Sequence, residues 1–118
     1  MRVYILDRPG KIRDQMRKWL SEDKRLIGVE VFQDYIQLIE EVGNSPPDFC
    51  FIRLGQDGIP GLKTADMVRQ ISSDTRIIFI SDDRDYALEA YEVGAYGYLL
   101  CPIKRDKLEK YLMMKKEM

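Results

Sequence analysis

Short apolar runs alternate with stretches of helical spacing five times along the chain. The apolar runs predict strands at residues 2–6, 29–32, 49–53, 76–80 and 96–100. Between them, the spacing of apolar residues predicts helices around residues 12–20, 35–42, 62–71 and 85–93, with a last helix after residue 103. Strands separated by helices indicate an α/β domain built of βαβ units. The central runs are continuously apolar, as a parallel sheet covered on both faces requires.

Turn and capping residues support these boundaries. Asp34 stands where the second helix needs an N-cap, and Gly94 is placed to end the fourth helix. The segment 43–47, Gly-Asn-Ser-Pro-Pro, separates a helix from the third strand, and a loop rich in Gly and Pro at residues 55–61 follows that strand. The punctuation therefore agrees with the hydrophobic pattern.

Composition narrows the class of protein. A length of 118 residues fits one domain, and 33% charged with 45% hydrophobic residues is typical of a soluble globular fold. The net charge of −1 argues against nucleic-acid binding by this segment itself. No apolar run approaches the ~20 residues of a membrane span, and the first residues lead directly into a strand. We therefore expect a cytoplasmic protein without a membrane partner.

The candidate site follows from the predicted sheet. In open parallel α/β sheets, ligands bind beyond the carboxyl ends of the strands. The residues that end or follow the predicted strands are Asp7 and Arg8, Arg53, Ser81, and finally Cys101 and Pro102. The third strand is apolar or small until Arg53, so a buried strand ends in a permanent cation.

At these positions the chain resembles response-regulator receiver domains, which have a CheY-like flavodoxin fold. The stretch 86–102, YALEAYEVGAYGYLLCP, resembles the receivers of LytTR-type transcription regulators. The resemblance implies one doubly wound domain over residues 1–118, with a five-stranded parallel sheet in the order 2-1-3-4-5. It also implies that a DNA-binding output domain would follow residue 118.

Receivers end their first strand in an acidic pair that holds a divalent ion and their third strand in the phosphoacceptor aspartate. A hydroxyl ends the fourth strand, and a Lys-Pro pair ends the fifth. On this pattern, Asp7, Ser81 and Pro102 match the family and Tyr98 matches its switch aromatic, whereas Arg8, Arg53 and Cys101 replace the second acid, the phosphoacceptor and the lysine. The resemblance thus implies a receiver with a degenerate site.

The replacements change the chemistry of the site. Three carboxylates and a lysine carry a net charge of −2, but Asp7, Arg8, Arg53 and neutral Cys101 carry +1, which repels Mg²⁺. Arg53 stays protonated and cannot act as the nucleophile. Asp57 is a substitute carboxylate in the following loop, but receivers show no such use. We expect no catalytic residue, no metal, no cofactor and no enzymatic activity.

Three functions remain open. The first is a regulatory and dimerisation module of a bacterial transcription regulator, pairing through the fourth helix, fifth strand and fifth helix as receivers commonly do, with DNA bound only by an output domain. The second is a stand-alone adaptor for a partner protein. The third is an anion or redox sensor built on Arg8, Arg53 and a Cys101 thiol of lowered pKa. Against it, both arginines could be solvated at a loop rim and Cys101 could be a small strand-end residue.

The interpretation makes four geometric predictions. Arg53 and Asp7, at the ends of adjacent strands, should form an ion pair. Ser81 and Tyr98 should form the coupling pair, and the resemblance implies a cis Cys101–Pro102 peptide. Cys50 and Cys101 lie two strand steps apart, about 10 Å, which is too far for a disulfide.

Overall fold

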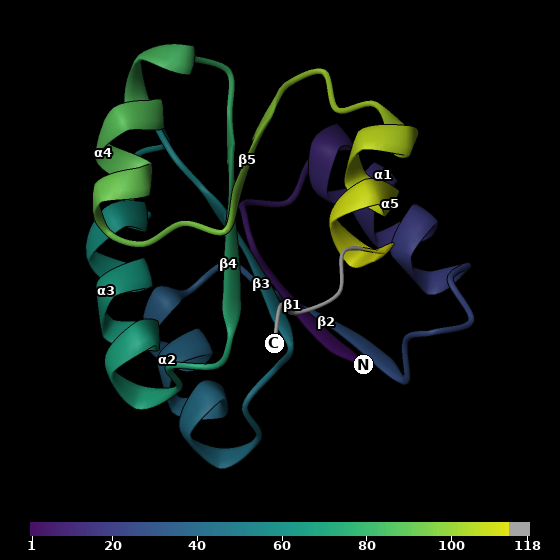
Figure 1. Ribbon diagram of the computed structural model, residues 1–118, viewed down its shortest axis with the longest axis horizontal. Coiled ribbons are helices and arrows are strands. Elements are labelled where there is room, and N and C mark those ends of the chain that lie inside the picture. The colour runs from purple at the N-terminus through teal and green to yellow at the C-terminus, as the bar shows by residue number, and fades with distance from the viewer. Residues whose placement is uncertain (114–118) are drawn as a thin grey trace.

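Five parallel strands form one sheet in the computed structural model, which describes residues 1–113 (Figure 1). The strands are β1 (Arg2–Leu6), β2 (Gly28–Phe32), β3 (Phe49–Arg53), β4 (Arg76–Ser81) and β5 (Gly97–Leu100). Their order is β2-β1-β3-β4-β5, so the predicted doubly wound topology is confirmed. The sequence of the final residues, 114–118, is helix-like. These residues lie outside the described part of the chain.

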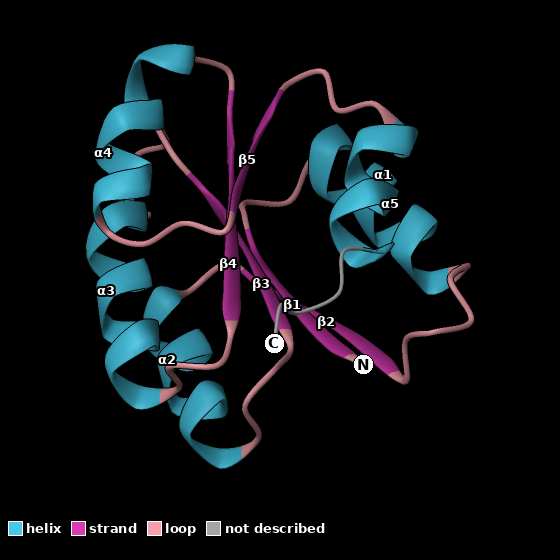
Figure 2. Cartoon of the chain, in the orientation of Figure 1, coloured by secondary structure: helices cyan, strands magenta, loops and turns pink. Residues whose placement is uncertain are grey.

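Helices cover both faces of this sheet. They are α1 (Lys11–Ser21), α2 (Tyr35–Asn44), α3 (Gly61–Ile71), α4 (Ala87–Glu92) and α5 (Arg105–Met113), with a 3-10 turn, η1 (Arg84–Tyr86), before α4. Figure 2 shows α1 and α5 on one face and α2, α3 and α4 on the other. The predicted cap and stop are also confirmed, since Asp34 accepts a hydrogen bond from the Ile36 N–H at 2.9 Å and Gly94 has a φ of +89°.

Two apolar layers hold the helices to the sheet. Alternate residues of each strand point to opposite faces, so Tyr4 packs in the layer under α2 and α3, and Ile5 packs in the layer under α1 and α5. All five residues of the central strand β3 are buried, including Arg53. A fully buried strand therefore ends in a cationic residue at the carboxyl edge of the sheet.

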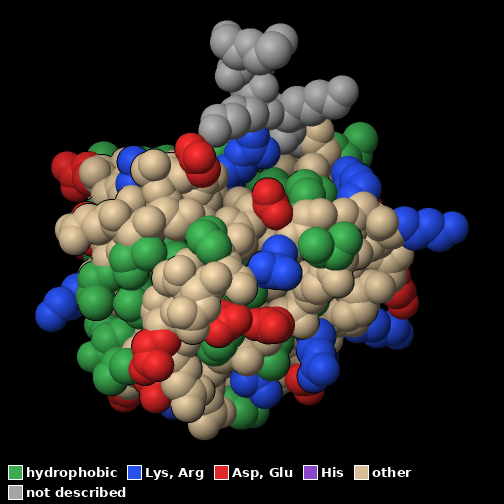
Figure 3. All heavy atoms as spheres, turned by 90° about the horizontal axis from the view of Figure 1, so that it is seen from below, with side chains coloured by type: hydrophobic (Ala, Val, Ile, Leu, Met, Phe, Trp, Pro, Cys, Tyr) green, Lys and Arg blue, Asp and Glu red, His purple; other side chains and the backbone are tan. Residues whose placement is uncertain are grey.

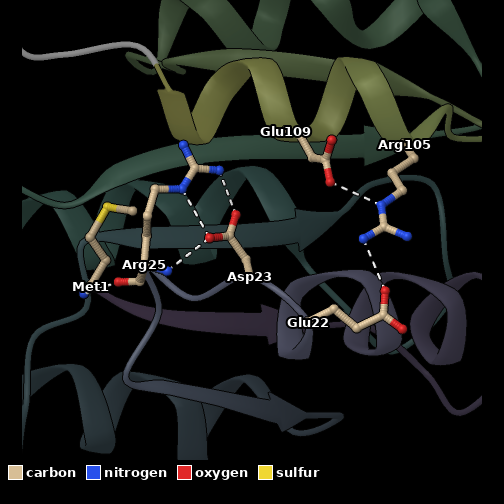
Figure 4. A network of polar contacts seen from close by, with 6 residues as sticks. All are labelled: Met1, Glu22, Asp23, Arg25, Arg105 and Glu109. Atoms are coloured by element: carbon tan, nitrogen blue, oxygen red, sulfur yellow. Dashed lines mark hydrogen bonds and ion pairs between the residues drawn. The ribbon is translucent and has the colours of Figure 1, made fainter.

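Exposed charged side chains also link the start of α5 to the residue that follows α1. Arg105 lies 2.9 Å from Glu22 and 2.9 Å from Glu109, and Arg25 pairs with Asp23 nearby (Figure 4). The two Arg105 pairs are exposed, and exposed pairs contribute about 0–1 kcal/mol each. The buried leucines of α5 at 108 and 112 hold this helix to the sheet more firmly than its charges do.

The loop after β3 is fixed by the close packing of Gly61. A Cβ atom at this position would lie 2.6 Å from the Arg53 carbonyl oxygen and 2.6 Å from Leu54 Cδ2. The backbone contact leaves little room for relaxation, so we expect Gly61→Ala to lower the free energy of unfolding by about 1–3 kcal/mol, measured by urea denaturation. Gly43→Ala is the matched control, because this helical glycine has nothing within 4 Å and its replacement should be neutral or stabilising. Equal stability of the two variants would contradict this account of the loop.

No helix within residues 1–113 is long and apolar enough to cross a membrane. On the face shown in Figure 3, acidic and basic side chains are interspersed with apolar ones rather than gathered by sign.

Candidate functional site

Arg53 lies at the centre of the candidate site, at the carboxyl edge of the sheet. Its side chain is 9% exposed. Its Nη1 donates to Cys101 Sγ at 3.1 Å, its Nε lies 3.7 Å from Asp7 Oδ1, and its Nη2 lies 3.9 Å from Asp82 Oδ2. The predicted Arg53–Asp7 ion pair is therefore confirmed, and the structure adds the Cys101 and Asp82 contacts.

The ion pair is long and does not use the fork of the guanidinium. Nε of Arg53 is buried and has no hydrogen-bond acceptor among residues 1–113. Asp7 is 4% exposed and accepts instead from the Arg8 backbone N–H at 2.8 Å. Burial raises the pKa of Asp7, and the opposing effects of Arg53 and of the Arg8 N–H do not cancel it. The site thus keeps a carboxylate whose charge is only partly compensated.

This raised pKa gives a stability prediction for Asp7→Asn. A carboxyl group with a raised folded-state pKa contributes stability that is complete below its unfolded pKa, 3.8, and is lost as the pH rises through the folded-state pKa. Asn keeps an acceptor for the Arg8 N–H but cannot ionise. We expect Asp7→Asn to gain stability relative to the wild type as the pH rises from 4 to 7.

Chemical denaturation of both proteins across this pH range is the measurement. Asp7→Ala is the comparison, because it also removes the acceptor and should be less stable than Asp7→Asn by about 1–3 kcal/mol. A stability difference between wild type and Asp7→Asn that does not change with pH would refute the burial argument.

Arg8 lies in the loop after β1 and lines the same pocket as Arg53. Its side chain is exposed and donates to Gln56 Oε1, which joins the loop after β1 to the loop after β3. The alternative of two solvated arginines is therefore right for Arg8 and wrong for Arg53, because the strand that carries Arg53 is buried along its whole length. No pattern in the sequence points to Gln56, whose role depends on the path of two loops.

Cys101 does not have the lowered thiol pKa that the redox hypothesis requires. Burial raises its pKa, and neighbouring Asp82 raises it further. Arg53 lowers the pKa, but by less than burial raises it. Cys50 is completely buried, and burial raises its pKa to about 12. Both cysteines are free, as the separation of their strands predicted.

The two thiols should accordingly be slow to react. With a disulfide reagent such as DTNB at pH 7.5, we expect Cys101 to react more slowly than a cysteine in an unfolded peptide and Cys50 to react only after unfolding. Absorbance would follow the reaction, and Cys101→Ser is the control that should abolish the native-state signal. Reaction of Cys101 faster than the peptide would reinstate the redox hypothesis.

Ser81 and Tyr98 meet at one backbone carbonyl. Ser81 Oγ donates to the Asp83 carbonyl oxygen at 3.0 Å and accepts from the Asp83 N–H at 2.9 Å. The Tyr98 hydroxyl donates to the same carbonyl oxygen. The two side chains therefore lie close together, and their coupling stays a prediction. The residue that joins them, Asp83, follows β4 and acts through its backbone.

The remaining predictions concern Pro102 and the carboxylates. The Cys101–Pro102 peptide is cis, as the resemblance implied. Asp57 is exposed and lies beside a second cavity next to Arg8, away from Arg53. Among residues 1–113, no group of three or more His, Cys, Asp or Glu is placed to hold a metal ion.

The comparisons with known proteins agree with this topology. The response regulator receiver domain family matches residues 3–113. The chain belongs to this family. It is 31% identical over 114 residues to the transcriptional regulatory protein BtsR of Escherichia coli K12, with 95% of the chain and 46% of that protein covered. It is 24% identical to the sensory transduction protein LytT of Bacillus cereus, with 95% and 46% covered.

A solved receiver structure has the same fold. The response regulatory domain of mrkE from Klebsiella pneumoniae superposes with a TM-score of 0.83 at 20% identity, covering 95% of this receiver and 92% of that chain. This receiver spans about half the length of the curated relatives it matches. Its relationship to two-component regulators, some of them transcriptional, therefore rests on the receiver half of those proteins.

Proposed function

We propose that this receiver does not accept a phosphoryl group and serves as the regulatory and dimerisation module of a bacterial transcription regulator. The observation that carries the proposal is the position of Arg53. It is the last residue of β3, and its guanidinium lies at the centre of the candidate site. At this position the family carries the aspartate that is phosphorylated. A guanidinium offers no nucleophilic oxygen and stays charged at neutral pH.

The surrounding groups support the same conclusion. Of the two carboxylates near Arg53, Asp7 is already engaged by a backbone N–H and by Arg53, and Asp82 has a side chain that is 68% exposed. Magnesium needs several hard oxygen ligands at about 2.0–2.1 Å, and a central cation opposes its approach. The receiver therefore performs no phosphoryl transfer of its own.

The coupling residues support a constitutive state. Ser81 and Tyr98 are both bound to the Asp83 carbonyl, so each hydroxyl has an acceptor within the protein without any phosphoryl group. Arg53 and Cys101 are likewise bound to each other. The face formed by α4, β5 and α5 is thus held in one arrangement that phosphorylation does not control.

That face has the exposed apolar residues a dimer needs. Leu88 and Tyr91 of α4 are 74% and 50% exposed, Leu100 of β5 is 39% exposed and Met113 of α5 is 67% exposed. Exposed apolar side chains on neighbouring elements are typical of interaction surfaces. Relatives of about twice the length, named as transcriptional regulators, support an output domain as the element that such a dimer would control.

Sedimentation equilibrium tests the dimer. We expect a dimer whose mass is unchanged by acetyl phosphate, and we expect Leu88→Glu to make it monomeric, because a charge placed at the centre of an apolar contact must be desolvated. Ile27→Glu is the matched control: Ile27 is 79% exposed but precedes β2, at the other side of the sheet. A wild-type monomer would contradict the homodimer and favour the adaptor function. Equal dissociation of both variants would place the interface elsewhere.

A further inference from the structure

A cavity of about 450 Å³ opens at the degenerate site, between the loop after β1 and the end of β3, and Asp7, Arg8 and Arg53 are part of its lining. Four cationic side chains line it, Arg8, Lys11, Arg13 and Arg53, against the single carboxylate of Asp7. The whole chain carries a formal charge of −1, so the positive net charge of the cavity lining is opposite in sign to that of the molecule. A concave wall of one charge sign attracts ligands of the opposite sign.

The amino-terminal end of α1 forms part of the same wall. The helix begins at Lys11, is 11 residues long and has no side-chain cap at Gly10. The first turn of a helix presents unused backbone N–H groups and the positive end of the helix dipole. Space is also available, because a Cβ atom built on Gly10 would meet nothing within 4 Å. Such an end binds anions, and phosphate groups in particular.

Arg53 provides an independent observation at the other wall. Its side chain is more than nine-tenths buried and lines the cavity, and both of its ion pairs within residues 1–113 are long, 3.7 Å to Asp7 and 3.9 Å to Asp82. Arg8, at the mouth, donates to the neutral amide of Gln56 rather than to a carboxylate. Both guanidinium groups therefore retain the capacity to bind oxyanions.

We propose that this cavity binds a ligand with two linked phosphate groups. The lining carries a net charge of +3, which exceeds the ~−1.5 to −2 of a single phosphate ester and is better matched by a diphosphate. One phosphate would lie at the start of α1 beside Lys11 and the other beside Arg8 and Arg53. The ligand is bound, not transferred to the chain, so the site does not depend on the function proposed above.

Isothermal titration calorimetry with inorganic pyrophosphate tests the proposal, at constant ionic strength and without added Mg²⁺. We expect a Kd below about 1 mM for pyrophosphate and weaker binding of inorganic phosphate. ADP forms a second arm: equal affinity for ADP and pyrophosphate assigns the site to the diphosphate alone, and tighter binding of ADP assigns it to a nucleoside diphosphate. Backbone amide shifts in an ¹⁵N-labelled sample should be centred on residues 10–13.

Charge-matched variants decide whether the binding is specific. Arg8→Gln with Lys11→Gln removes two exposed cations of the cavity and should weaken pyrophosphate binding by at least about tenfold. Lys104→Gln with Lys107→Gln removes two exposed cations outside the cavity and should leave the affinity unchanged. No detectable binding by the wild type, or equal weakening in both double variants, would overturn the proposal without affecting the test of phosphorylation.

Discussion

Incubation of the chain with acetyl phosphate and Mg²⁺ is expected to leave its intact mass unchanged. The residue at the end of β3 is an arginine. The nearest carboxylate is that of Asp7, which is buried and has an oxygen 3.7 Å from the Arg53 Nε. A buried carboxylate that already faces a cation and a backbone N–H is poorly placed to attack phosphorus. Electrospray mass spectrometry of the whole chain measures the outcome directly. A stoichiometric adduct of one phosphoryl group would contradict the proposed function.

Restoring the family's residues extends this prediction. Arg53→Asp alone should remain unphosphorylated, because Arg8 still stands where the second metal-binding acid belongs and no lysine is present at 101. Combining it with Arg8→Asp and Cys101→Lys should yield a phosphorylated fraction. The pair of variants separates the missing nucleophile from the missing metal site. Robust phosphorylation of the single variant would show that the electrostatic obstacle is smaller than we infer.

Replacement of Arg53 by Met should produce the largest loss of stability at the site. Met keeps most of the apolar stem but leaves Asp7 buried without its nearest cation. Breaking a buried ion pair by removing one partner costs about 3–5 kcal/mol, and the long Nε–Oδ1 distance places the expected cost near the lower end, about 3 kcal/mol at pH 7. Urea denaturation measures it.

The pH dependence of that loss has a definite sign. Without Arg53, the pKa of Asp7 should rise further, so the missing stability is greatest at neutral pH and shrinks as the pH falls towards 4 and the carboxyl group becomes protonated in both folded proteins. Arg53→Met combined with Asp7→Asn should recover most of the loss at pH 7. A double variant no more stable than Arg53→Met would mean that Arg53 stabilises the fold through packing instead of charge.

The fold could be predicted because each strand and helix carries its own local signal. The runs at 49–53 and 76–80 are continuously apolar, and Asp34 and Gly94 mark helix boundaries through backbone chemistry that hardly depends on the rest of the structure. The second strand begins one residue before its predicted start, at Gly28, and the fifth begins one residue after its predicted start, at Gly97, because pairing with the neighbouring strand decides where each begins.

The site could be predicted in its membership but only partly in its energetics. Asp7, Arg53 and Cys101 follow from the topology, which brings the strand ends together. Of the two alternatives left open for Cys101, the thiol of lowered pKa is wrong, because burial raises the pKa more than Arg53 lowers it and because Arg8 donates to Gln56 instead. Burial and loop direction are tertiary properties that no spacing of residues encodes.

The contact between Arg53 and Cys101 also limits which residues these two positions can hold together. Nη1 of Arg53 lies 3.1 Å from the sulfur, so a lysine at 101 would bring two cations into contact in a largely buried place. An acidic residue at 53 would instead be stabilised by a lysine at 101, because their charges are opposite. The two positions should therefore change together among related sequences, with arginine at the first accompanied by a small neutral residue at the second. That pairing is a two-residue signature by which other receivers of this type can be recognised.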